Sequence, residues 1–263
     1  MPTLIGQNYS VADTFLLNSE VTMIEAITTI QPYLRVYPSD EQVFDEPVTR
    51  YARHLLPLVS IDLSVVNPSW QGWIHLVNTV EPEDEMVGIA THPFHNYWLR
   101  ENWIGFHIND EGRYEMLGDF RYFYLENQPG TLPEHYPGHR QELEEHYVVQ
   151  HTGFAEARTR FAQRGVFYSQ NLIRLNPDLD LSREEPSTLI TQLGGGVGAG
   201  NWAYGFPLDE GDENNVRPLT PEGIPFHFIA SVHGWDYCAS GADSILLFYE
   251  PDSKMALLTF DWS

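Results

Sequence analysis

The alternation of hydrophobic and polar positions along the chain predicts a protein rich in strands. Residues 54–66 alternate from Leu58 onward, and residues 72–80 alternate again, as expected for strands with one buried face. Residues 103–125 contain an apolar segment, the turn sequence Asn-Asp-Glu-Gly and a second short segment, which predicts a strand, a turn and a strand. Three apolar runs predict strands near the C-terminus: 226–232, 244–249 and 256–260.

One long segment has helical spacing instead. Between residues 139 and 164 the apolar positions recur at intervals that place most of them on one side of a helix: Leu143, Tyr147, Phe154, Ala157 and Phe161. Residues 127–138 concentrate proline and glycine, which interrupt both regular structures. We therefore place a boundary near residue 135, between an N-terminal β-rich half (1–135) and a C-terminal half (136–263) that begins with the helix.

The two halves share an order of residues. Residues 56–82 and 224–251 each contain a proline-led strand, a turn with tryptophan, and a strand that begins after glycine and ends in Glu-Pro. Pro57 and Pro82 are 25 positions apart, and Pro225 and Pro251 are 26 apart. This match favours an internal duplication. The predicted fold class is α+β and β-rich, with antiparallel sheets in two similar halves and a few helices.

The second half resembles the YwqG-like family over about residues 185–263. The segments that carry the resemblance are Thr191-Gln-Leu-Gly-Gly195, Asn201-Trp202, Gly223–Val232, Gly241–Pro251 and Phe260–Ser263. The chain departs from the family pattern after the Gly-Gly turn, where Gly196-Val-Gly-Ala-Gly-Asn201 replaces the usual prolines. The resemblance implies an α+β protein of two similar β-rich halves without established catalytic residues. Relatives of this kind occur in bacterial toxin-immunity systems, so the resemblance also makes an inhibitory role plausible.

Charge narrows the choice of partner. The 263 residues include 37 Asp and Glu but only 14 Lys and Arg, which gives a formal net charge of -23. A polyanion repels nucleic acid and anionic membranes, so neither is an expected partner. A cationic macromolecule is favoured, because opposite charge accelerates encounter. Solubility is the competing explanation of the negative charge.

The expected compartment is the cytoplasm. The N-terminal sequence has no basic segment followed by an apolar one, as a secretion signal would, and no stretch approaches the ~20 apolar residues of a membrane-spanning helix. The lone Cys238 cannot form an intrachain disulfide, which agrees with a reducing compartment. We interpret Cys238 as a small buried apolar residue rather than a nucleophile.

Motifs for catalysis or cofactor binding are weak. The run Gly194–Gly200 formally fits a dinucleotide fingerprint, but the residues after it cannot begin a long helix, so a tight or flexible loop is favoured. The pair Glu142 and His146 is the least improbable metal hypothesis among the histidines, which otherwise match no ligand pattern. No serine nucleophile motif occurs. We expect no cofactor, no metal and no catalytic residue.

Two acidic segments beside aromatic residues form the predicted partner-binding site. One lies next to Trp70 and Trp73, and the other follows Phe206. Interfaces combine aromatic anchors with charge that steers the partner. The predicted partner-binding residues are Glu81, Glu83, Asp84 and Glu85 in the first segment, and Trp202, Tyr204, Asp209, Glu210, Asp212 and Glu213 in the second.

The sequence therefore predicts a non-enzymatic cytoplasmic immunity protein that occludes a cationic, nuclease-type bacterial toxin. The alternative is a small-molecule-binding protein or an enzyme that uses a cleft between the two halves. The residues considered for that cleft are Asn201, Trp202, His227 and His233.

Overall fold

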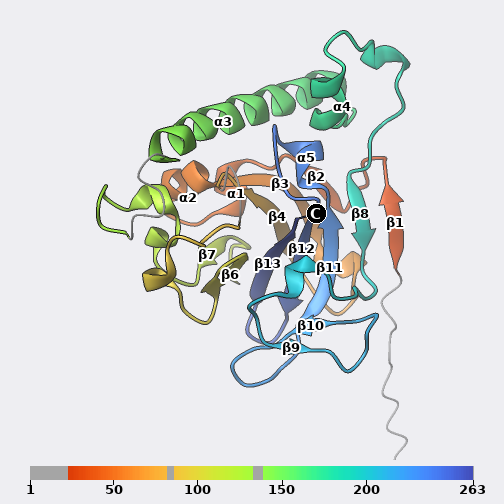
Figure 1. Ribbon diagram of the computed structural model, residues 1–263. Helices are drawn as coiled ribbons and strands as arrows, with labels where there is room; N and C mark the ends of the chain where they lie inside the picture. Colours follow the sequence, from red (N-terminus) through yellow and green to blue (C-terminus); the bar gives the residue numbers. More distant parts are fainter. Residues whose placement is uncertain (1–22, 82–85, 133–138, 263) are drawn as a thin grey trace, which may run out of the picture.

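The computed structural model describes residues 23–81, 86–132 and 139–262 (Figure 1). Within them, an antiparallel sheet of eight strands has the order β1-β8-β11-β12-β13-β6-β5, with β7 paired to β6. Its strands are β1 (Ile24–Ile27), β5 (Leu99–Arg100), β6 (Trp103–Ile108), β7 (Tyr114–Met116), β8 (Ile190–Leu193), β11 (His227–Val232), β12 (Ser244–Glu250) and β13 (Met255–Asp261). The predicted α+β, β-rich class with antiparallel sheets is confirmed.

Two smaller sheets accompany the large one. A three-stranded sheet has the order β2-β3-β4, from β2 (Leu34–Val36), β3 (Leu55–Asp62) and β4 (Trp73–Thr79). A short hairpin pairs β9 (Leu208–Asp209) with β10 (Arg217–Pro218). All three sheets are antiparallel.

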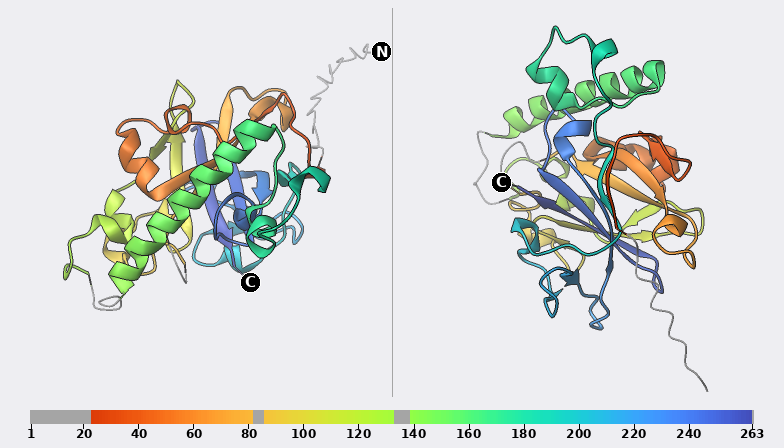
Figure 2. Two further views of the ribbon diagram at one scale, coloured as in Figure 1. Left: turned by 90° about the horizontal axis from the view of Figure 1, so that it is seen from above. Right: turned by 90° about the vertical axis from the view of Figure 1, so that its right-hand side faces the viewer.

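Five α-helices lie in the described residues: α1 (Asp40–Val43), α2 (Val48–His54), α3 (His139–Arg164), α4 (Gln170–Leu175) and α5 (Gly234–Tyr237). The predicted helix over 139–164 is confirmed as α3, which runs diagonally across the molecule when seen from above (Figure 2). Its apolar side is buried in the main core, as the spacing of Leu143, Tyr147 and Phe154 requires. None of the helices in the described parts of the chain has the length and apolar composition needed to cross a bilayer.

The large sheet is buried on both faces. On β12, Ile245 and Leu247 point into the main core shared with the three-stranded sheet and α3, whereas Leu246 and Phe248 point into a second cluster on the opposite face. Side chains of a strand alternate between faces, so burial of both faces requires continuous apolar runs rather than alternation. The runs 244–249 and 256–260 have that composition.

The second cluster, here called the aromatic platform, supports the chain between β8 and β11. Its buried residues are Trp103, Trp202, Phe206, Val216, Phe226, Phe228, Leu246, Phe248 and Leu257. Rings pack edge to face or tilted within it, with the Trp103 and Phe206 centroids 4.6 Å apart. Large aromatic side chains bury much apolar area each, so this cluster stabilises a segment that has little regular structure of its own.

Strands from both sides of residue 135 share the large sheet, since β13 pairs with β6. The segments matched in the sequence, 56–82 and 224–251, each contain an antiparallel pair with one register irregularity, β3 with β4 and β11 with β12. These common features do not establish a duplication. The duplication and the division near residue 135 stay predictions.

Tyr114 on β7 joins the two sheets. Its hydroxyl donates to the carbonyl of His75 at 2.6 Å and accepts the backbone N–H of the same residue at 2.9 Å. Because β4 is an edge strand, these buried groups have no neighbouring strand to pair with. The Tyr114 ring stacks on Phe106 of β6, with the ring centroids 4.6 Å apart. The large sheet therefore holds the side chain whose hydroxyl pairs with the backbone N–H and carbonyl at the edge of the small sheet.

We expect Tyr114→Phe to lower the free energy of unfolding by about 1–3 kcal/mol, because a buried N–H and a buried carbonyl lose their partner. Urea unfolding followed by circular dichroism measures this change. Tyr204→Phe removes the same hydroxyl from a side chain that is 67% exposed and should leave stability unchanged. Equal stability of both variants would show that the Tyr114 hydroxyl does not secure the edge of β4.

Candidate functional site

The acidic segment after Phe206 forms the tip of the β9–β10 hairpin. Arg217 pairs with Asp209 across the hairpin, through Nη2 and Oδ2 at 2.5 Å. The side chains of Glu210, Asp212 and Glu213 are exposed, and none of them forms an ion pair with a base in the described residues. Three carboxylates thus face solvent without neutralisation at one turn.

The glycine-rich loop fixes the backbone of this tip. The N–H of Val216 donates to the carbonyl of Val197 at 2.8 Å, which joins the hairpin to the loop. A Cβ atom on Gly196 would lie 2.5 Å from the carbonyl oxygen of Asn214, and one on Gly198 would lie 3.1 Å from that of Glu213. Glycine is therefore needed for close backbone approach, which agrees with the tight loop, one of the two alternatives that the sequence left open.

Two predicted aromatic contacts differ in accessibility. Tyr204 follows the short 3-10 helix Asn201–Ala203 and is 67% exposed, so its ring is available to a partner. Trp202 is only 1% exposed, donates from Nε1 to the Gly198 carbonyl and packs in the aromatic platform. The ring supports the loop from inside and offers no exposed surface, which corrects the expectation of an exposed Trp202; its contribution to partner binding stays a prediction.

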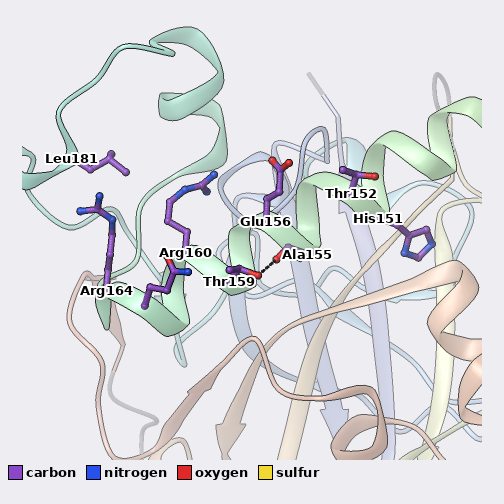
Figure 3. A pocket seen from close by; sticks show the side chains of 9 residues that line it. His151, Thr152, Ala155, Glu156, Thr159, Arg160, Arg164 and Leu181 are labelled. Carbon is purple, nitrogen blue, oxygen red and sulfur yellow. Dashed lines mark hydrogen bonds between the residues drawn. The ribbon is translucent and has the colours of Figure 1, made fainter.

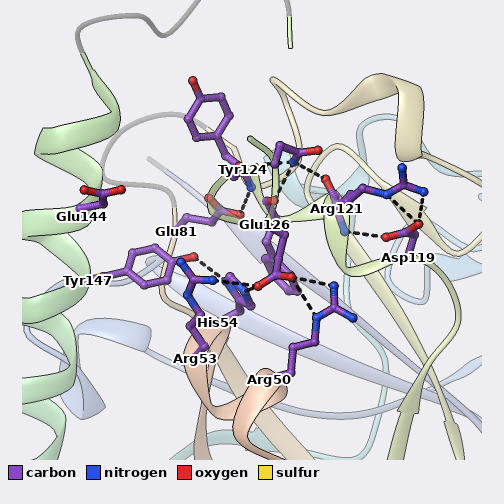
Figure 4. A network of polar contacts seen from close by, with 12 residues as sticks. Arg50, Arg53, His54, Glu81, Asp119, Arg121, Tyr124, Glu126, Glu144 and Tyr147 are labelled. Atoms are coloured by element: carbon purple, nitrogen blue, oxygen red, sulfur yellow. Dashed lines mark hydrogen bonds and ion pairs between the residues drawn. The ribbon is translucent and has the colours of Figure 1, made fainter. Parts of the chain in front are cut away.

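The first acidic segment does not form the expected surface. Glu83, Asp84 and Glu85 lie outside the described residues. Glu81 is 4% exposed, and its Oε1 accepts the backbone N–H of Tyr124 at 2.7 Å (Figure 4). Glu81 is therefore a buried group, which corrects its expected role as a surface carboxylate.

The expected aromatic neighbours of the first segment are also distant from it. Trp73 begins β4 and Glu81 follows its end. At about 3.3 Å per residue, the strand separates them by roughly 25 Å. The Trp73 ring instead packs against Arg35, whose guanidinium carbon lies 3.6 Å from the ring centroid. Proximity in sequence on the two sides of a strand does not make a combined surface.

A network of buried polar groups holds α2 against α3 (Figure 4). Burial lowers the pKa of His54 to about 4, so the ring is neutral at pH 7. Its Nε2 lies 2.9 Å from Oε1 of Glu126 and its Nδ1 lies 2.8 Å from the Tyr147 hydroxyl. Since a carboxylate only accepts, Nε2–H donates to Glu126 and Nδ1 accepts from Tyr147.

Two arginines complete the network. The Glu126 carboxylate forms ion pairs with both: Arg50 Nη2 lies 2.7 Å from Oε2, and Arg53 Nη1 lies 2.9 Å from Oε1. Burial acts to raise the pKa of Glu126, but hydrogen bonds from His54 and Arg50 outweigh it and the net pKa is lowered. The His54 side chain is fully buried, so this group ties elements together and presents no base to a substrate.

The other sites considered from the sequence have structural partners. His146 Nε2 lies 2.9 Å from the carbonyl of Val80, and no group of three or more His, Cys, Asp or Glu in the described residues is placed to hold a metal. Cys238 is fully buried, and burial raises the pKa of its thiol to about 12, which suppresses the thiolate. The Nδ1 of His233 lies 2.5 Å from the Asp243 carbonyl, to which it donates.

Sequence reasoning missed a cluster of arginines on α3. Arg158, Arg160 and Arg164 lie near its C-terminus, and the latter two line a groove of about 780 Å³. Their spacing on a predicted helix, in a chain with few bases, was a signal that could have identified them.

A comparison with protein-family models, curated proteins and solved structures finds no match for the chain. The resemblance to the YwqG-like family stays a prediction.

Burial of Glu81 predicts a pH dependence of stability. Burial, opposed by the Tyr124 hydrogen bond, raises the pKa of Glu81 to about 8, so the native state retains a proton that the unfolded state releases above pH 4.5. Its stabilising contribution is lost as pH rises towards 8, by up to about 1.4 kcal/mol per pH unit. His54 and His75 have lowered pKa values, so their contributions are lost only below pH 6.5.

We expect Glu81→Gln, which keeps an acceptor for Tyr124, to flatten the decline in unfolding free energy between pH 6.5 and 8. Urea titrations at half-unit intervals measure the two slopes. Parallel slopes for the native protein and the variant would show that Glu81 is ionised when folded.

Gly196→Ala should lower the unfolding free energy by about 1–3 kcal/mol, because the new methyl group meets the Asn214 carbonyl. Gly198→Ala meets a carbonyl at 3.1 Å and should cost less. Thermal unfolding of both variants tests this order, and the reverse order would contradict the packing of the loop under the hairpin.

Proposed function

We propose that the protein is a non-enzymatic binding protein that occludes a cationic protein partner, most concretely an immunity protein against a nuclease-type bacterial toxin. The observation that carries the proposal is the unneutralised, exposed set Glu210, Asp212 and Glu213 at the tip of the β9–β10 hairpin. A nuclease must present a basic surface to phosphates. Carboxylates held at a fixed tip compete with phosphates for that surface.

Rigidity supports this role. The hairpin rests on the aromatic platform through Phe206 and Val216, and the glycine-rich loop packs against its backbone. A preorganised tip loses little conformational entropy on binding. Charge then accelerates association, and the exposed ring of Tyr204 offers apolar area for an anchor contact.

The alternative, a small-molecule binder that uses a cleft between the halves, is favoured by one observation. A groove of about 300 Å³ is lined by residues of both predicted halves. Asp40, Ala52 and Leu56 come from the first half, and the other lining residues belong to α3. The groove does not include Asn201, Trp202, His227 or His233. A rise in melting temperature with one compound of a metabolite panel would support this alternative.

The test of the main proposal begins with capture of the partner from the native cell at low salt, its identification, and reconstitution from purified components. We expect Glu210→Gln/Asp212→Asn/Glu213→Gln to slow association by about tenfold and to weaken its dependence on salt. Stopped-flow kinetics measure both effects. If the partner is a toxin, co-expression with the native protein should restore growth and the triple variant should do so poorly.

A matched control changes the same charge elsewhere. Glu145, Asp178 and Glu185 are exposed and distant from the hairpin in sequence, so Glu145→Gln/Asp178→Asn/Glu185→Gln tests net charge alone. The control should retain association rates close to those of the native protein. Equal slowing in both triple variants, or unaltered toxicity on co-expression, would contradict the proposal.

A further inference from the structure

The groove that Arg160 and Arg164 line lies between α3 and the segment that contains Leu181 (Figure 3). Its volume of about 780 Å³ is within the range of sites for small ligands, roughly 300–1,000 Å³. Figures 1 and 2 place α3 and the β9–β10 hairpin at opposite ends of the molecule. The groove is therefore separate from the proposed partner-binding surface.

Neither arginine of the groove forms an ion pair with a carboxylate of the described residues. Arg160 donates from Nη1 to Oε1 of Gln170 at 2.9 Å, and the side chain of Arg164 forms no hydrogen bond or ion pair with a residue in the described parts of the chain. Asp180 is not the ion-pair partner of Arg164. Hydrogen bonds from Ser182 are the main cause of the lowered pKa of Asp180, and the charge of Arg164 has a smaller effect. Two unpaired cations are unusual where acidic residues outnumber basic ones by 37 to 14.

Spacing sets what the pair can hold. Arg160 and Arg164 are one helical turn apart, so both guanidinium groups project from the same face, where like charges repel without a bound anion. Planar guanidinium groups match the oxygen geometry of phosphate and can bind it through paired hydrogen bonds. The pair therefore favours a phosphate group between the two side chains.

The remaining lining selects the rest of the ligand. Glu156 precedes Arg160 by one turn, is exposed in the groove and forms no ion pair with a described base. A carboxylate accepts hydrogen bonds from hydroxyl groups and repels a second anion. Leu181 and Ala155 add apolar contacts. A ligand with phosphate at one end and hydroxyl groups at the other matches this order along α3.

We propose that this groove binds a phosphate monoester of a hydroxyl-bearing small molecule, a sugar phosphate or a nucleoside monophosphate. Arg160 and Arg164 hold the phosphate, and Glu156 accepts hydrogen bonds from the hydroxyl groups.

Isothermal titration calorimetry on the full chain at low salt tests this site with four probes: ribose 5-phosphate, adenosine monophosphate, inorganic phosphate and adenosine. We expect at least one of the two monoesters to bind, more tightly than inorganic phosphate, and adenosine not to bind. Preference between the monoesters distinguishes a sugar phosphate from a nucleotide as the ligand. Absence of binding by both monoesters at millimolar concentration would overturn the proposal.

Variants locate the binding. Arg160→Gln and Arg164→Gln should each weaken monoester binding about tenfold, whereas Arg174→Gln, an exposed arginine of α4 outside the groove, should leave it unchanged. Glu156→Gln should weaken ribose 5-phosphate and leave inorganic phosphate no weaker. Circular dichroism and melting temperature confirm that each variant is folded. Equal loss in Arg174→Gln and Arg160→Gln would assign the binding to general charge and overturn the site.

Discussion

The shortage of basic residues is the constraint on which the arrangement of charges in this molecule depends. With 14 bases for 37 acids, most carboxylates cannot be paired, and the position of each arginine decides which ones are. Arg50 and Arg53 both contact Glu126, inside a network that joins α2 to α3. Glu81 nearby has no arginine of its own within ion-pair distance among the described residues, and burial raises its pKa to about 8. At pH 7 the Glu81 carboxyl group is therefore neutral because it is protonated, whereas Glu126 is compensated by ion pairs.

The same shortage applies to the two surfaces for which binding is proposed. At the β9–β10 hairpin, Arg217 pairs with Asp209, while three carboxylates remain exposed. Near the C-terminus of α3 the balance is reversed, since residues 155–164 hold three arginines and one glutamate. Arg160 and Arg164 have no carboxylate within ion-pair distance among the described residues. Isolated surface charges contribute little to the free energy of folding, so the fold does not require these charges. The two surfaces would attract ligands of opposite sign.

Much of the fold follows from local patterns. The helix at 139–164 and the strands at 72–80, 226–232 and 244–249 lie where the periodicity places them, because side chains repeat every 3.6 or 2 residues against a core. Pairing of β13 with β6 is a contact between distant segments and leaves no local signal. In the sequence, continuous apolar runs indicate that both faces of the large sheet are buried. They do not indicate which elements cover each face.

The candidate site was predicted less completely. Proximity in sequence grouped Trp202 with the acidic hairpin, but the side chain turns inward and supports the loop. Glu81 was grouped with its acidic neighbours, although its oxygen accepts the N–H of Tyr124, a residue 43 positions away. Direction of a side chain outside regular structure depends on tertiary partners, and the sequence does not name them. The sequence predicted a tight or flexible loop at the glycine run, and the backbone that passes against it became visible only in the structure.

The most direct measurement is the association rate of the reconstituted complex as a function of salt, for the native protein, the hairpin variant Glu210→Gln/Asp212→Asn/Glu213→Gln and the control Glu145→Gln/Asp178→Asn/Glu185→Gln. If the hairpin carboxylates guide a cationic partner, the rate falls steeply with salt for the native protein and the control, and the hairpin variant is slower with a shallower slope. Indistinguishable rates and slopes for the hairpin variant and the control would contradict the account.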